Sequence, residues 1–266
     1  MAAMSTNVTM VGSGEKVVVL AHGYGGNQAV WDGLVPHLSK NYRILLFDWD
    51  FSGNGSDVDP SSYSFTAYAD DLITLMDERN LNDAVYIGHS MAGMIGCIAS
   101  IKRRDLFAHL VLIAASPRYL NSEDYVGGFE KEDVDGILSS IETNFQDWAL
   151  KFVPVAIGVN NSVFIKMLGR SFCTMRPDVA LAVARTIFLG DHRDVLDEVD
   201  VPCTIIQTTD DFAVPVSVGQ YMQSKIREAS LEIIEAGGHF PQLTTRDLVI
   251  EILDGVLPPI NAAYYN

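Results

Sequence analysis

Residues 87–93 read Ile-Gly-His-Ser-Met-Ala-Gly, between a short apolar run and a segment with helical periodicity. The run at 84–87 predicts a buried strand, and the small residues Gly88 and Ala92 would let that strand and the following helix approach closely. A serine at such a sharp strand-to-helix turn is exposed as a nucleophile at the carboxyl end of a sheet. An ordinary serine N-cap is the alternative interpretation of Ser90 that this stretch leaves open.

Short apolar runs alternate with helical patterns on both sides of this stretch, which predicts βαβ units and a mostly parallel sheet flanked by helices. Uninterrupted apolar runs are typical of strands buried on both faces. Helical periodicity covers 66–79 and 91–102. Strands are predicted at 17–21, 42–47, 84–87, 110–114, 204–207 and 231–234.

The alternation of strands and helices stops after 110–114. Residues 121–193 contain four helical stretches and no convincing strand. Glycine and proline separate these stretches, at Gly127, Gly128, Pro154, Gly158 and Pro177. We therefore expect 121–193 to form a helical cap inserted into one discontinuous core domain, made of 1–120 and 194–266.

Two polar groups that can serve a serine nucleophile follow later strands. Asp210 and Asp211 come after the strand at 204–207, and the acid–x–x–Val–Pro spacing favours Asp211. His239 follows the last predicted strand in a glycine-rich loop. The order serine, aspartate, histidine is that of an α/β-hydrolase fold. In this interpretation Ser90 attacks an acyl carbonyl, His239 transfers the proton and Asp211 orients the imidazole.

An oxyanion hole is predicted from the turn His22-Gly23-Tyr24-Gly25, which follows the first predicted strand. A turn at this place commonly supplies one backbone N–H, and the residue after the nucleophile supplies the second. The predicted donors are therefore the amides of Tyr24 and Met91. A turn shaped only for packing is the alternative.

Composition excludes several other classes of function. The 266-residue chain carries 34 acidic and 18 basic residues, a net charge of −16, which argues against binding nucleic acid or anionic lipid through a general electrostatic surface. No apolar run approaches the roughly 20 residues that span a bilayer. Residues 1–10 lack the features of a signal peptide, so we expect a cytoplasmic and nuclear protein.

The three cysteines, Cys97, Cys173 and Cys203, are too few and too scattered for a disulfide framework or a metal site. Cys97 and Cys203 lie in apolar stretches and are expected to be buried thiols. We expect no metal and no cofactor. No heptad pattern or interface stripe is present, and a monomer is expected.

Several stretches resemble the plant strigolactone and karrikin receptor hydrolases, the Dwarf-fourteen and karrikin-insensitive family. The likeness covers nearly the whole chain, through 11–38, 88–107, 113–130, 172–188, 200–222 and 237–243. Ser-Pro-Arg-Tyr at 116–119 and Gly-Gly-Phe-Glu at 127–130 are its most specific parts. Within the family, 48–53, 100–107 and 112–125 look most like the DLK (Dwarf-fourteen-like) branch.

The resemblance implies a small apolar butenolide-type ligand, held beneath a four-helix cap and slowly hydrolysed. In signalling members, ligand processing leads to recruitment of an F-box protein and a repressor. The pocket wall it implies consists of Tyr24, Phe129, Trp148, Phe152, Leu168, Phe188, Phe212 and Ala213. Core packing is the alternative for each of these side chains.

The chain also departs from the receptors. Phe212 replaces a smaller aliphatic residue, which can shrink the cavity, and 49–59 is unlike the receptor sequence. Two further functions therefore stay open: a general small-ester hydrolase without signalling, and a ligand-binding receptor whose catalysis is dispensable.

Overall fold

The computed structural model describes residues 5–52 and 60–257. Its described strands form one seven-stranded sheet in the order β1-β3-β2-β4-β5-β6-β7. All neighbours from β3 to β7 are parallel, and β1 pairs antiparallel with β3. The strands are β1 Ser5–Val11, β2 Val17–Ala21, β3 Arg43–Trp49, β4 Ala84–His89, β5 Phe107–Ile113, β6 Cys203–Asp210 and β7 Ala229–Gly237.

The six predicted strands are confirmed, with ends that differ by a few residues. The prediction at 110–114 runs one residue too far, because Ala114 has φ +49° and ends β5. Strand β1 was not predicted. It reads Ser-Thr-Asn-Val-Thr-Met-Val and lies at the edge of the sheet, so it lacks the uninterrupted apolar run of a strand buried on both faces.

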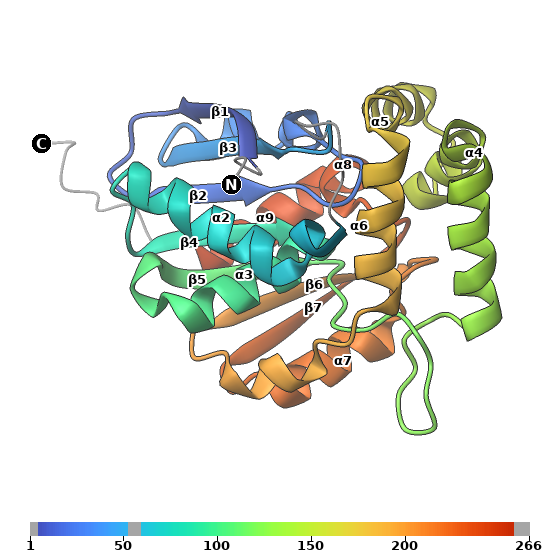
Figure 1. Ribbon diagram of the computed structural model, residues 1–266. Coiled ribbons are helices and arrows are strands. Elements are labelled where there is room, and N and C mark those ends of the chain that lie inside the picture. The colour runs from blue at the N-terminus through green and yellow to red at the C-terminus, as the bar shows by residue number, and fades with distance from the viewer. Residues whose placement is uncertain (1–4, 53–59, 258–266) are drawn as a thin grey trace, which may run out of the picture.

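Helices cover both faces of the sheet (Figure 1). Helices α2 (Phe65–Glu78), α3 (Met91–Lys102) and α7 (Val216–Lys225) lie in front of the sheet in that view, and α8 (Pro241–Thr244) and α9 (Arg246–Val256) lie behind it. The remaining short helices of the core are η1 Gln28–Trp31, α1 Val35–Leu38, η2 Pro60–Tyr63, η3 Arg104–Leu106 and η4 Arg193–Glu198.

The chain between β5 and β6 carries the cap, which lies beyond the carboxyl ends of the strands (Figure 1). Its helices are α4 (Lys131–Ile157), α5 (Ser162–Cys173) and α6 (Pro177–Leu189). Helix α4 is broken at Asn144, which has φ −159° and ψ +89°. The Asn144 side chain accepts a hydrogen bond from the Asp147 N–H at 3.1 Å and so begins a second helical segment.

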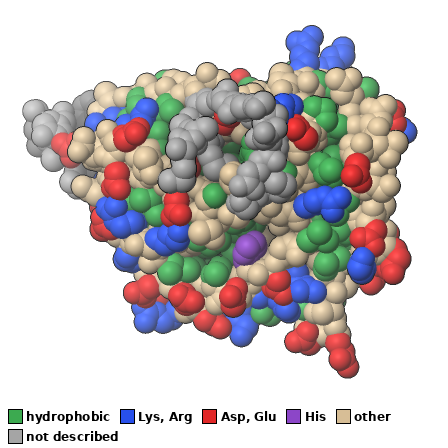
Figure 2. All heavy atoms as spheres, in the orientation of Figure 1, with side chains coloured by type: hydrophobic (Ala, Val, Ile, Leu, Met, Phe, Trp, Pro, Cys, Tyr) green, Lys and Arg blue, Asp and Glu red, His purple; other side chains and the backbone are tan. Residues whose placement is uncertain are grey.

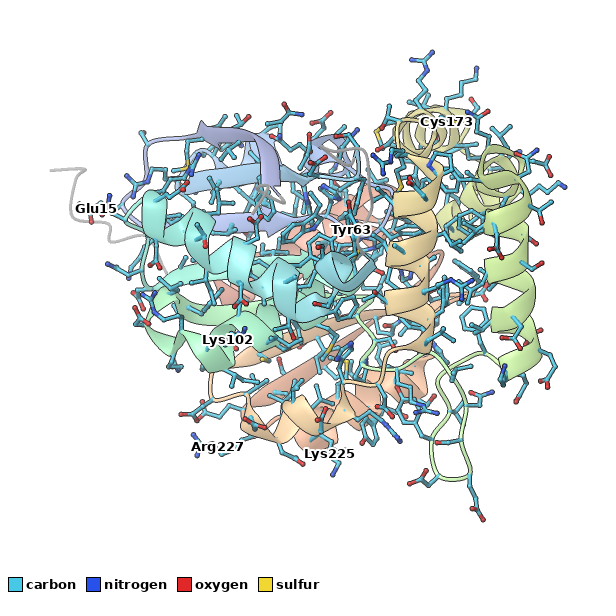
Figure 3. All side chains as sticks on the ribbon, in the orientation of Figure 1. Glu15, Tyr63, Lys102, Cys173, Lys225 and Arg227 are labelled. Atoms are coloured by element: carbon cyan, nitrogen blue, oxygen red, sulfur yellow. The ribbon has the colours of Figure 1, made fainter. Side chains whose placement is uncertain are left out.

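The cap helices therefore make the four predicted segments, and all of them lie inside 121–193. The boundaries drawn between cap and core at 120/121 and 193/194 stay a prediction. Cys97 and Cys203 are buried as expected, and Cys173 is exposed at the outer end of α5 (Figure 3).

None of the helices in the described ranges is both long and apolar enough to cross a bilayer. The face drawn in Figure 2 shows acidic and basic side chains interspersed among apolar ones. Part of the departing segment at 49–59, residues 53–59, lies outside the described residues.

Candidate active site

Ser90 occupies a strained turn between β4 and α3. Its backbone has φ +56° and ψ −122°, a conformation that costs a non-glycine residue about 1–3 kcal/mol. A Cβ atom on Gly88 would lie 2.6 Å from the Ala92 carbonyl oxygen, so the small residue is required by the close approach of strand and helix. The Ser90 side chain makes no capping hydrogen bond to α3, which removes the N-cap alternative.

The structure brings Ser90, His239 and Asp211 together from the ends of three strands. His239 Nε2 lies 2.9 Å from Ser90 Oγ, and His239 Nδ1 lies 2.8 Å from Asp211 Oδ2. When Nδ1–H donates to the carboxylate, Nε2 is left to accept the serine hydroxyl proton. This arrangement can activate Ser90 as a nucleophile.

Asp211 is held as an ionised acceptor. Its Oδ1 accepts the backbone N–H groups of Ala213 at 2.8 Å and Val214 at 3.3 Å. Burial by itself would raise the pKa of this carboxyl, but attraction to His239 and the hydrogen bonds from His239 and the two amides lower it below its usual value. The Asp210 carbonyl accepts the Gly238 N–H of this loop at 2.9 Å. The spacing argument therefore selected the aspartate that contacts His239.

The two predicted oxyanion donors follow the adjacent strands β2 and β4. Met91 is the first residue of α3, where helix N–H groups have no partner inside the helix. Tyr24 follows β2, which pairs with β4 so that Ala21 lies opposite Gly88. Neither amide donates a hydrogen bond to another of the described residues. Their service as an oxyanion hole stays a prediction.

A small cavity of about 30 Å³ lies between Ser90 and the cap. Most of its wall is aromatic, and five of the predicted pocket residues line it. The lining residues are Tyr24, His89, Ser90, Tyr119, Phe152, Ile187, Phe188, Phe212, Ala213, His239 and Phe240.

The other three predicted pocket residues, Phe129, Trp148 and Leu168, do not line this cavity. Trp148 stacks on Phe152 with ring centroids 4.6 Å apart, and Phe129 meets Phe188 edge to face at 5.8 Å. Leu168 is fully buried in the core. Their place in the wall of a ligand-filled pocket stays a prediction.

Comparison with known proteins identifies the fold family. The model of the alpha/beta hydrolase family matches residues 18–252. The chain belongs to the alpha/beta hydrolase family. Together with the Ser90–His239–Asp211 arrangement, this makes it a serine ester hydrolase.

Within this family the hydrolase is similar to plant receptors and esterases. It is 44% identical to karrikin insensitive 2 receptor IA of Petunia hybrida, over 92% of each chain. It is 45% identical to a probable esterase of Oryza sativa subsp. japonica, over 93% of each chain. It is 39% identical to the strigolactone esterase D14 of Arabidopsis thaliana, over 95% of this chain and 96% of that protein. These likenesses place it with the karrikin-insensitive and Dwarf-fourteen proteins, and its position in the DLK branch stays a prediction.

A solved structure supports the same fold. The hydrolase olei00960 of Oleispira antarctica superposes with a TM-score of 0.90 at 34% identity, over 94% of each chain.

Tyr119 is a residue of this site that the pattern of motifs did not single out. Its hydroxyl lies 3.5 Å from Ser90 Oγ, and burial raises its pKa, so the phenol stays protonated. Tyr119 ends the Ser-Pro-Arg-Tyr stretch that carried the family resemblance. The specificity of this stretch for the family was the one sequence feature that could have pointed to Tyr119. Only the structure shows that the stretch lies next to Ser90.

Two buried histidines also support the site. His89 is enclosed beneath the turn and lies 2.7 Å, through Nε2, from the His239 carbonyl oxygen, so that its N–H can donate there. Burial lowers the pKa of His89 to about 3. The His22 ring lies 2.8 Å, through Nδ1, from the Gly23 carbonyl and accepts the Trp49 N–H at 3.1 Å through Nε2. His22 therefore ties the loop of Tyr24 to β3.

In the described ranges, no group of three or more His, Cys, Asp or Glu residues is arranged to hold a metal ion.

Proposed function

We propose that this hydrolase binds a small, largely apolar ester or lactone of the butenolide type beneath the cap and cleaves it slowly at Ser90. The observation that carries the proposal is the assembled Ser90–His239–Asp211 triad, which faces an aromatic cavity. An apolar wall with a few polar groups suits a small, rigid, mostly apolar ligand. The names of the similar plant proteins, karrikin receptors and strigolactone esterases, support the butenolide class.

The reaction begins when Ser90 Oγ attacks the carbonyl carbon while its proton passes to His239 Nε2. The amides of Tyr24 and Met91 stabilise the negative oxygen of the tetrahedral intermediate. The carbon–oxygen bond to the leaving group then breaks, and His239 returns the proton to that oxygen. Water hydrolyses the acyl-serine by the same two proton transfers, while Asp211 stays ionised and stabilises the imidazolium.

The small size of the cavity supports slow turnover. A cavity of about 30 Å³ must widen before a lactone ring fits beside Ser90. Widening requires rings from the cap and the core to move apart, and such conformational steps limit the rate of many enzymes.

Incubation with each enantiomer of a synthetic strigolactone analogue tests this proposal. Release of the butenolide ring by the wild-type protein is expected, with none from Ser90→Ala. The proposal fails if neither enantiomer is cleaved and neither shifts the melting temperature.

General small-ester hydrolysis is a second candidate, favoured by the likeness to the bacterial hydrolase. It predicts turnover of many p-nitrophenyl esters at more than ~1 s⁻¹. A ligand-binding receptor with dispensable catalysis is a third candidate, favoured by the receptor names of the relatives. It predicts that Ser90→Ala leaves ligand affinity and partner binding unchanged.

We further propose that the protein is a monomer of the cytoplasm and nucleus that signals through an F-box protein and a repressor. The family resemblance supports the partners. Pull-downs with and without ligand test them, light scattering tests the monomer, and a fluorescent fusion tests the location.

A further inference from the structure

The loop that carries His239 is fixed to β6 by two hydrogen bonds. The Gly238 N–H donates to the Asp210 carbonyl at 2.9 Å, and the Thr208 hydroxyl donates to the Gly238 carbonyl at 2.8 Å. On the Ser90 side, the ring of His89 is placed to donate to the His239 carbonyl. These contacts leave the N–H of His239 itself to be satisfied.

The cap satisfies that N–H. It donates to the Ala156 carbonyl at 2.8 Å, and Ala156 lies in the last turn of α4. Carbonyls in the last turn of a helix have no partner inside the helix. One of these free acceptors of α4 therefore holds the backbone of the histidine that activates Ser90.

Two glycines allow the end of α4 to come this close to the histidine loop. Gly158 ends α4 with φ +70°, and a Cβ there would lie 2.5 Å from Gly238 Cα. Gly238 has φ +96°, and a Cβ there would lie 2.2 Å from the Ile157 carbonyl oxygen. Both positions need glycine, for the backbone conformation and for the close backbone contact.

The same end of α4 forms part of the cavity wall. Phe152 lines the cavity and lies four residues before Ala156, so the two share one face of the helix. A single helical segment thus contacts the space for the ligand and supports His239.

We infer that the C-terminal turn of α4 positions His239 for proton transfer, with Gly158 and Gly238 as positioning residues of the acyl-transfer step. The inference rests on the proposed chemistry at Ser90. Displacing the turn lengthens the 2.9 Å contact between His239 Nε2 and Ser90 Oγ, and misplacing a reacting group by about 1 Å can cost about 100-fold in rate.

Fluorophosphonate labelling of Ser90 tests the inference, because the labelling amplitude counts folded sites and the rate constant reports how well His239 activates each one. Gly158→Ala and Gly238→Ala are expected to label at least ~10-fold more slowly per site than the wild type. With p-nitrophenyl acetate they are expected to lower kcat by a similar factor and to change KM less than ~3-fold.

The chain offers two matched controls. A Cβ on Gly136, in α4, meets nothing within 4 Å, and a Cβ on Gly237, the last residue of β7, meets nothing closer than 3.7 Å. Gly136→Ala and Gly237→Ala are expected to label at the wild-type rate.

Gly158→Asn distinguishes the effect of the close contact with Gly238 from the effect of backbone strain at position 158. Asparagine tolerates a positive φ better than alanine, but its Cβ meets the same atoms of Gly238. We expect it to be as slow as Gly158→Ala. The inference is overturned if Gly158→Asn labels at the wild-type rate, or if the Gly158 and Gly238 variants lose only amplitude and keep the per-site rate of the controls. Absence of labelling in the wild type would instead defeat the proposed function itself.

Discussion

The two sides of the cavity are held by different forces. On the core side, Ser90, His239 and Asp211 are joined by hydrogen bonds of 2.8–2.9 Å, and backbone amides fix the carboxylate. On the cap side, Phe152 is held by ring packing, against Trp148 at 4.6 Å and Phe212 at 5.5 Å between centroids.

This difference separates the chemistry from the binding space. Hydrogen bonds are directional and fix positions closely, whereas the hydrophobic effect is non-directional and allows rings to repack. We therefore expect the catalytic groups to keep their geometry while the cavity changes its volume. The backbone link between α4 and His239 is the place where the two sides are joined.

The largest expected effect comes from the core side. His239→Ala removes the group that accepts the Ser90 proton, and it is expected to lower ester hydrolysis by at least ~10³-fold. Ser90→Ala is expected to have an equal effect, and the double variant no greater one, because the residues act as a unit. Rates on p-nitrophenyl acetate measure this. If the double variant lost the sum of the two single losses in free energy, the claim that Ser90 and His239 act as a unit would be wrong.

The second effect is a pH dependence of stability. The folded His89 ring stays neutral down to its pKa of about 3, whereas its ordinary pKa is 6.5. Below pH 6.5 the unfolded chain binds a proton that the folded chain does not, so stability falls with decreasing pH by up to about 1.4 kcal/mol per unit.

His89→Gln can keep a donor toward the His239 carbonyl but cannot titrate. Its urea unfolding free energy is expected to fall less steeply than that of the wild type between pH 6 and about 4. Parallel curves for the two proteins would show that His89 does not stay neutral in the fold.

The third effect comes from the aromatic wall of the cavity. Phe212 lines the cavity, and Phe212→Leu is expected to enlarge it and to raise kcat/KM for esters with longer acyl chains by about 10-fold. Phe129→Leu is the control, since Phe129 does not line this cavity. Equal gains from both variants would contradict the assignment of the wall.

The smallest effect is expected from Tyr119→Phe. The hydroxyl is 3.5 Å from Ser90 Oγ, at the limit of a hydrogen bond, so its loss should change kcat only by about 3-fold. Because burial raises the pKa of Tyr119, the ratio of wild-type to variant rates is expected to be constant from pH 6 to 9. A ratio that varies over this range would show that the phenol titrates there.

The core side of the site could be predicted to the residue. Ser90 and Asp211 follow the buried strands β4 and β6, and His239 follows the edge strand β7. Parallel strands bring their carboxyl ends to one edge of the sheet. Once the strands are recognised by their apolar runs, chain order places the three side chains together. The edge strand β1 escaped prediction because an edge strand need not be apolar on both faces.

The cap wall could not be predicted in the same way. Which aromatic residues of a cap helix face the cavity depends on the break of α4 at Asn144 and on how the rings pack. Phe152 and Trp148 are four residues apart on one helix, yet only Phe152 reaches the cavity. Tyr119 was missed because its loop has no hydrophobic periodicity and no motif that assigns this residue a chemical role.

Covalent capture at Ser90 tests the central claim most directly. The protein is mixed with p-nitrophenyl acetate, quenched in acid, digested and analysed by mass spectrometry. We predict one acetyl group, on the peptide that contains Ser90, which forms before the first turnover is complete and is absent from Ser90→Ala. Full hydrolysis with no acyl group on Ser90, or hydrolysis that persists in Ser90→Ala, would contradict the account.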